Sequence, residues 1–195
     1  SFVNLMTKRI FNVLLVANPY DAFMLEDDGR IDEKIFNEYM NLSLRYPPRF
    51  TQVSTEEAAW KQLENTTFDL VICMPGSDNS DTFEIARSIK EQYPHIPLVV
   101  LTPFCWLGNT DLLVSIIKLI EDKMNLEHDI KEVGVQMILL VEDSIRFYSS
   151  VLPNLYKFVL KQSQEFATEA LNAHQRTLRM RGRPKIVLAR TYEEA

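Results

Sequence analysis

Short continuous runs of apolar residues, separated by stretches of helical periodicity, set the pattern of this chain. Each run is rich in Val, Ile or Leu and lacks polar alternation, which is typical of parallel strands covered by helices on both faces. Four runs have this character, at residues 12–16, 68–73, 97–101 and 137–141. Two further runs, 50–53 and 185–189, follow prolines and are interpreted as edge strands.

Amphipathic helical patterns lie between these runs. Residues 31–44 place Ile31, Ile35 and Tyr39 on one face, and a second helix is expected to begin after Thr55, a suitable N-cap. Further helices are predicted at 81–92, 110–124 and 145–181. Strand and helix therefore alternate, which predicts an α/β fold built on a doubly wound parallel sheet.

The chain repeats part of its own pattern. Residues 13–18 align with 138–143, and residues 48–55 align with 184–191. We interpret this as one nearly whole unit followed by a partial second βαβ unit with a longer helix. The predicted organisation is a first domain, a linker and the first half of a second domain, at residues 8–125, 126–136 and 137–195.

Composition and charge narrow the class of protein. The 195 residues carry a net charge of -6, which argues against nucleic acid as the main partner because a phosphate backbone requires a basic surface. No apolar run approaches the ~20 residues of a membrane span, and the first ten residues do not resemble a signal peptide. The two cysteines have no metal-ligand spacing and are expected to be reduced, so we predict a cytoplasmic protein.

One motif carries a family resemblance. Residues 138–144, Ile-Leu-Leu-Val-Glu-Asp-Ser, resemble the opening of response-regulator receiver domains, in which an acidic pair follows the first strand. Residues 68–75 are similar to the third receiver strand, and residues 96–102 are similar to the fourth, which ends in a threonine. The resemblance implies a flavodoxin-like (receiver) sheet with its site at the carboxyl ends of the strands.

The resemblance also implies where receiver chemistry would take place. A receiver holds Mg²⁺ on its acidic pair, accepts the phosphoryl group on an aspartate and uses a threonine and a lysine to stabilise charge. In the first unit the acidic pair falls on Ala17 and Asn18, the acceptor on Met74 and the lysine on Cys105, while Thr102 is retained. This degenerate set implies a pseudo-receiver that has no catalytic residues and no cofactor.

The spacing after the fourth strand of the first unit is irregular. Thr102 and Cys105 are three residues apart, whereas the corresponding receiver positions are separated by a helix and a strand. A parallel crossover needs about a dozen residues. Either this unit is shortened, or the sequence omits a segment at this point.

The second unit keeps more of the receiver pattern. Glu142 and Asp143 match the acidic pair, so the resemblance implies a possible Mg²⁺ site there. The matching acceptor aspartate would lie beyond Ala195. Solvated acidic residues at a strand end are the alternative interpretation.

A long helix at 145–181, bent at Pro153, is expected to need a packing partner, since it would extend for roughly 55 Å. Its apolar stripe predicts a homodimer interface; the alternative is packing across the first unit. The stripe consists of Tyr148, Val151, Leu152, Leu155, Val159 and Phe166. A basic cluster follows and is interpreted as cations at a helix C-terminus, at Arg176, Arg179, Arg181, Arg183 and Lys185.

Three functional hypotheses follow. The first is a non-catalytic signalling module of the two-component (phosphorelay) type that acts through protein–protein contacts. The second is a phosphorylatable response regulator that uses its second unit. The third draws on a resemblance of the whole chain to the N-terminal region of bacterial phosphoenolpyruvate synthase or pyruvate phosphate dikinase-like proteins, and implies a regulatory part of such an enzyme.

Overall fold

The computed structural model describes residues 2–17, 30–74, 80–101, 110–168 and 172–195. The chain divides into two compact units, which are described separately. The sheet unit comprises residues 10–37 and 46–110, and the helical unit comprises residues 1–9, 38–45 and 111–195.

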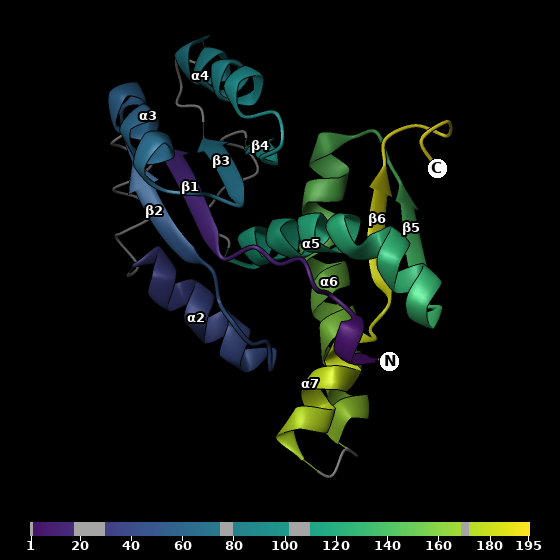
Figure 1. The fold of residues 1–195 in the computed structure, drawn as a ribbon. Coiled ribbons are helices and arrows are strands. Elements are labelled where there is room, and N and C mark those ends of the chain that lie inside the picture. The colour runs from purple at the N-terminus through teal and green to yellow at the C-terminus, as the bar shows by residue number, and fades with distance from the viewer. Residues whose placement is uncertain (1, 18–29, 75–79, 102–109, 169–171) are drawn as a thin grey trace. The chain divides into compact units, whose positions relative to one another are not determined.

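Four parallel strands form the sheet of the sheet unit (Figure 1). In spatial order they are β2 (Arg49–Val53), β1 (Asn12–Ala17), β3 (Leu70–Met74) and β4 (Leu98–Val100). Neighbouring strands that are not consecutive in the chain require crossover connections. The predicted α/β class with a parallel sheet is therefore confirmed, and each of the four strands lies within two residues of its predicted start.

Helices α2 (Ile31–Asn41), α3 (Glu56–Asn65) and α4 (Ser80–Gln92) follow the strands. Thr55 is the N-cap of α3, as predicted, and its side chain accepts a hydrogen bond of 3.2 Å from the Ala58 amide. Apolar residues of α3 and α4 pack in one cluster with Leu14 and Val71 of the two central strands.

Side chains on both faces of β1 and β3 are buried, including Leu15 and Ile72, which alternate with Leu14 and Val71. Continuous apolar runs therefore predicted doubly covered strands correctly for the centre of this sheet.

The amide groups at the start of the sheet are held by carboxylates. Asp69 Oδ2 accepts hydrogen bonds from the amides of Phe11 (2.9 Å) and Asn12 (2.8 Å). At the outer strand β2, Asp32 Oδ1 accepts a 3.1 Å bond from the amide of Phe50. Side-chain acceptors thus satisfy backbone donors that the strand ladder leaves unpaired.

The helical unit contains a two-stranded parallel sheet of β5 (Met137–Val141) and β6 (Lys185–Ala189) (Figure 1). Its helices are α5 (Thr110–Val133), α6 (Ile145–Thr168) and α7 (Ala173–Arg181), preceded by a short 3-10 turn, η1 (Phe2–Asn4). The connection from β5 to β6 runs through α6 and α7, so the predicted second βαβ unit is observed.

Two predictions about the helices are wrong. Residues 126–136 are not a linker, because α5 continues to Val133 and ends at Gly134, whose φ of 70° suits a glycine and whose amide bonds to Ile130. The single helix expected at 145–181 is two helices: α6 contains Pro153, and α7 starts from its own N-cap, Asn172.

The predicted burial of β5 is also wrong. Met137, Leu139 and Val141 point to one face of the strand and are 38–48% exposed. Ile138 and Leu140, on the other face of β5, are only partly buried, so neither face of this strand is fully covered in the described residues.

None of the described helices is both long and apolar enough to cross a membrane.

Candidate functional site

The carboxyl ends of β1 and β3 bring together two of the degenerate receiver positions. Ala17 is the register partner of Met74 in the parallel pair. Their side chains are 2% and 3% exposed. Asn18, Thr102 and Cys105 lie outside the described residues, so the structure places two of the five positions.

Among the described residues at these strand ends, Ala17 and Met74 offer no group suited to phosphoryl chemistry. A methyl group cannot ligate a metal ion, and a thioether cannot form an acyl phosphate. The neighbouring Cys73 is fully buried, and burial raises the pKa of its thiol to about 12. Cys73 points to the face of β3 opposite to Met74, so this raised pKa describes the α3 and α4 side of the sheet.

Glu142 and Asp143 follow the carboxyl end of β5, where the resemblance puts an acidic pair. The amide of Glu142 continues the ladder by donating to Ala189 O at 3.0 Å. Its Oε1 accepts a 3.0 Å bond from the Ser144 amide, and the Asp143 side chain is exposed. Among the described residues, no three His, Cys, Asp or Glu side chains cluster as metal ligands would.

The predicted interface stripe on α6 separates into inner and outer residues. Leu152 and Val159 are buried, so these two pack within the chain rather than facing a partner. Tyr148, Val151 and Leu155 are partly exposed, and Phe166 is 66% exposed.

The inner face of α6 packs in the helical unit through polar contacts as well. The Tyr156 hydroxyl donates to Asp122 at 2.9 Å, and Lys157 lies 3.0 Å from Asp111. Intramolecular packing therefore accounts for this face, while Phe147 and Phe158, at 52% and 62% exposure, remain on the outside.

A stripe of polar residues on α5 forms the buried centre of the helical unit. The spacing of these residues places them on one helix face, where a hydrophobic stripe is the usual arrangement. They are Lys118, Glu121, Asp122, Asn125 and Asp129, and each is at most 5% exposed.

Asp122 is the most connected member of the stripe. Its carboxylate forms a two-pronged ion pair with Arg183, with distances of 2.7 Å and 2.9 Å. It also accepts hydrogen bonds from the Tyr156 hydroxyl and from the Ile186 amide (3.0 Å). Burial raises the pKa of Tyr156, and the Asp122 charge raises it further, so this phenol stays a donor.

Asp129 holds a second group of partners. Its Oδ2 lies 2.8 Å from Lys185 Nζ, and both oxygens accept from the Met6 amide. Burial alone would raise the pKa of Asp129, but hydrogen bonds from Lys185 and His128 lower it overall. Burial and the Arg183 charge lower the pKa of Lys185. The Asp122 and Asp129 carboxylates raise this pKa, but by less, so it is lowered overall.

The third pair of the stripe is Lys118 with Glu121. Lys118 Nζ lies 2.6 Å from Glu121 Oε2 and 4.9 Å from the centre of the Tyr39 ring. Burial by itself lowers the pKa of Lys118, but the Glu121 carboxylate raises it overall. Asn125 completes the stripe by exchanging hydrogen bonds with the backbone of Lys8.

These buried charges were missed from the sequence, where Arg183 and Lys185 were interpreted as cations at a helix end. That interpretation is wrong for both: Arg183 is paired with Asp122, and Lys185 lies at the start of β6. Two signals could have found them. Charged residues recur at helical spacing in 118–129, and two cations alternate in 183–185 ahead of an apolar strand.

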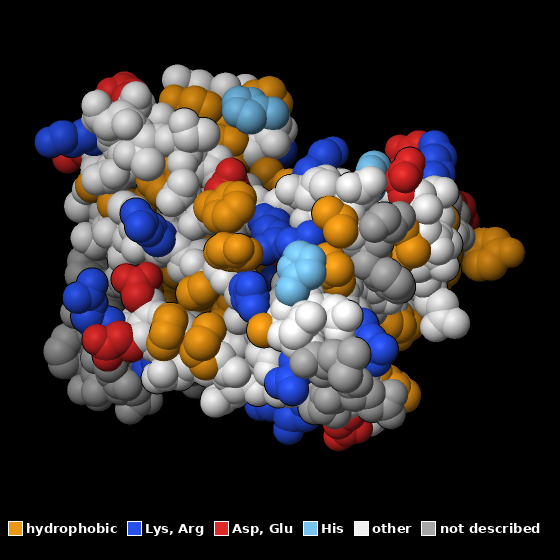
Figure 2. All heavy atoms as spheres, turned by 60° about the horizontal axis from the view of Figure 1, so that its bottom comes forward, with side chains coloured by type: hydrophobic (Ala, Val, Ile, Leu, Met, Phe, Trp, Pro, Cys, Tyr) orange, Lys and Arg blue, Asp and Glu red, His pale blue; other side chains and the backbone are white. Residues whose placement is uncertain are grey.

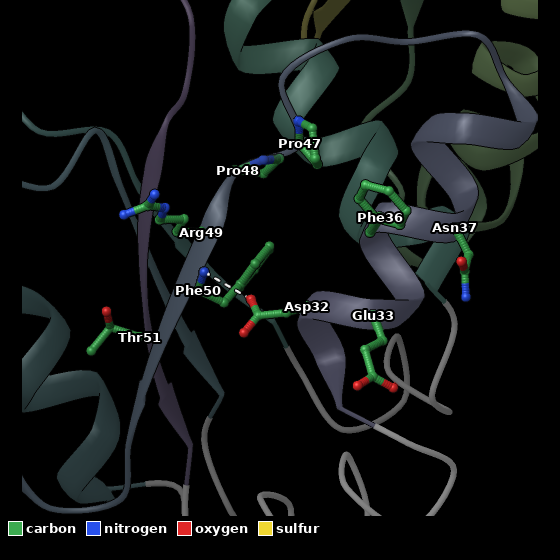
Figure 3. A pocket seen from close by; sticks show the side chains of 9 residues that line it. All are labelled: Asp32, Glu33, Phe36, Asn37, Pro47, Pro48, Arg49, Phe50 and Thr51. Carbon is green, nitrogen blue, oxygen red and sulfur yellow. Dashed lines mark hydrogen bonds between the residues drawn. The ribbon is translucent and has the colours of Figure 1, made fainter.

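An open groove in the sheet unit lies at the other end of the strands from Ala17 and Met74. Figure 3 shows α2 on one side, with Asp32, Glu33 and Phe36, and the start of β2 on the other, with Pro48 and Phe50. The Asp32 carboxylate turns across the groove to the Phe50 amide. This carboxylate is therefore engaged in holding the outer strand.

Comparison of the sequence with models of known protein families and with curated proteins finds no match. The resemblance to receivers therefore rests on the residues and strands described above.

The Asp122 ion pair gives a direct stability prediction. Asp122→Asn leaves Arg183 buried without its carboxylate and leaves Lys185 with Asp129 alone, so we expect the free energy of unfolding to fall by about 3–5 kcal/mol. Urea denaturation followed by circular dichroism measures this. Asp111→Asn is the matched control, because its pair with the partly exposed Lys157 should contribute under ~1 kcal/mol. Equal losses in the two variants would contradict a special role for Asp122.

The lowered pKa of Asp129 predicts a dependence on acid. A carboxylate with a lowered folded pKa contributes stability above its ordinary pKa, which is near ~4, and that contribution is lost as pH falls through the folded value. Asp129→Asn should therefore be less stable at neutral pH and should lose stability less steeply on acidification. Urea denaturation from pH 7 to about pH 3 tests this, and parallel curves for variant and parent would refute it.

Proposed function

We propose that this chain is a non-catalytic signalling module of the two-component type, in which the sheet unit is a pseudo-receiver that acts through protein contacts. The observation that carries the proposal is the pairing of Ala17 with Met74. These residues occupy adjacent carboxyl ends of central parallel strands, where a receiver keeps a metal-binding acid and its phosphoryl acceptor. The strand order β2-β1-β3-β4 supports the same interpretation, since it is compatible with a flavodoxin-like sheet.

The chemistry of the strand ends supports a loss of phosphoryl transfer. Mg²⁺ requires oxygen ligands, and an acyl phosphate requires a carboxylate nucleophile. Ala17 and Met74 supply neither, and both side chains are packed in the core. The sheet unit then serves as a scaffold that presents surfaces.

One observation favours a second candidate function. Glu142 and Asp143 follow β5 of a parallel βαβ unit, which is where a receiver would hold Mg²⁺. One oxygen of Glu142 is used by the turn, and Asp143 is exposed and accessible to an ion. In this alternative, the helical unit is the receiver-like half of a phosphorylatable regulator.

The outer face of α6 is the surface we propose for self-association. Phe147 and Phe158 are both more than half exposed and are 11 residues apart, which is about three helical turns, so they lie on one side of the helix. Val151, between them, is partly exposed. Large exposed aromatic side chains on one helix face are typical of protein interfaces.

Treatment with acetyl phosphate and Mg²⁺, followed by intact-mass measurement, tests the loss of phosphoryl transfer. We expect no added phosphoryl group on this chain, while an active receiver treated in parallel gains one. A hydroxylamine-labile addition on this chain would contradict the proposal, because it would show a carboxylate acceptor.

Sedimentation analysis tests self-association through α6. We expect the parent chain to sediment as a dimer and Phe158→Asp to sediment as a monomer, since a buried charge at the centre of the interface is strongly unfavourable. Phe83→Asp, on the exposed side of α4, is the matched control and should leave the dimer intact. A monomeric parent chain, or a Phe158→Asp dimer, would refute this interface.

A further inference from the structure

The helical unit contains a pocket of about 310 Å³ that none of the functions considered above uses. It lies between the segment around residues 40–45, the end of α6 and α7. Its wall combines thioether and aliphatic side chains with two arginines and two neutral polar groups. The residues that matter here are Met40, Ser43, Arg45, Gln164, Arg176 and Met180.

The pocket arginines, Arg45 and Arg176, differ in their hydrogen bonds from Arg179 and Arg181 of α7. Arg179 donates to Phe166 O and Arg181 donates to Val3 O, each at 3.0 Å, so both of these guanidinium groups are engaged by the backbone. Within the described part of the chain, neither Arg45 nor Arg176 is paired with a carboxylate, and no acidic residue lines the pocket. The pocket is thus a positively charged site on a chain whose net charge is -6.

Ser43 adds a hydrogen-bond donor. Its hydroxyl oxygen accepts a 2.7 Å bond from Gln164 Nε2, which leaves the hydroxyl hydrogen able to donate to a ligand. The backbone at Ser43 is left-handed, with φ of 53°, and its amide donates to Met40 O at 3.0 Å. A fixed turn therefore holds this hydroxyl at the pocket.

The first residue of α7, Ala173, also lines the pocket. The amino end of a helix carries partial positive charge and favours anions. Figure 2, turned so that the bottom of Figure 1 comes forward, shows Lys and Arg side chains beside hydrophobic ones on this face of the molecule. The electrostatics of the helix end thus add to those of the two arginines.

We propose that this pocket binds a small organic anion, a phosphate monoester or a carboxylate, with its charged group between Arg45 and Arg176 and its apolar part against Met40 and Met180. The volume is at the lower end of small-molecule sites, which suits a metabolite rather than a cofactor of nucleotide size. Guanidinium groups bind phosphate and carboxylate oxygens through paired donors. A bound anion joins α7, α6 and the 40–45 segment, so it stabilises the helical unit.

Titration with phenyl phosphate, followed by isothermal calorimetry and by amide chemical shifts, tests the proposal. Hexanoate is the carboxylate probe, inorganic phosphate lacks the apolar part, and phenol lacks the charge. We expect phenyl phosphate or hexanoate to bind more tightly than inorganic phosphate and phenol, with shifts in residues 43–45 and 173–176. Whichever of the two binds more tightly identifies the charged group.

Arg45→Gln and Arg176→Gln should each weaken binding by about tenfold or more, since each removes a charge-assisted hydrogen bond. Arg146→Gln is the matched control: it removes the same charge from an exposed position of α6 outside the pocket and should leave affinity within about twofold. Absence of binding by both anionic probes at millimolar concentration would overturn the proposal. Equal weakening in all three variants would also overturn it, because it would show attraction to overall charge.

Discussion

The ends of the two central strands of the sheet unit are apolar, and the proposed function depends on this constraint. Ala17 and Met74 face each other across the parallel pair, and both are packed into the core. An unpaired carboxylate would be unfavourable in such a place, because a buried charge is destabilising unless opposite charges or hydrogen bonds compensate it. On the opposite face of β3, burial raises the pKa of the Cys73 thiol to about 12, so this side of the strand also disfavours negative charge. Residues that pack therefore occupy these strand ends, and in the proposed function the sheet unit acts on other proteins through its surfaces.

The helical unit, in contrast to the apolar strand ends of the sheet unit, buries charged side chains. Its centre is charged, and both aspartates on the polar stripe of α5 have partners from distant segments: Asp122 binds Arg183, and Asp129 binds Lys185 and the amide of Met6. Such pairs bring little net stability over an apolar core, but breaking one leaves an uncompensated buried charge. They can act together only if α5, β6, α6 and the N-terminal segment are all in place. This requirement gives the helical unit a defined frame from which the outer face of α6 and the arginine-lined pocket are presented.

Local sequence was a good guide to the sheet and a poor guide to the buried charges. Continuous apolar runs located β1, β3, β5 and β6, and Thr55 capped α3 as its position indicated. The stripe from Lys118 to Asp129 was missed because a polar helix face usually faces water. Its aspartates can be buried because cations some 60 residues later in the chain neutralise them. Residues 126–136 were mistaken for a linker for a similar reason. The backbone amides that bind this part of α5 belong to Met6 and Lys8, which are far away in the sequence. Ala17 and Met74 end β1 and β3 in register, and their assignment to receiver positions stays a prediction from the resemblance.

The methyl signals of Ala17 and Met74 test most directly whether the carboxyl ends of the sheet unit are inert. A sample labelled with ¹³C in the Met and Ala methyl groups would be titrated with Mg²⁺ and then with beryllofluoride, which mimics a phosphoryl group on an active receiver. The account predicts that both signals stay in place through both additions, with the remaining methyl signals as internal reference. A saturable shift of the Met74 and Ala17 signals that requires Mg²⁺ would show a ligand bound at these strand ends, and would contradict the proposal of a pseudo-receiver.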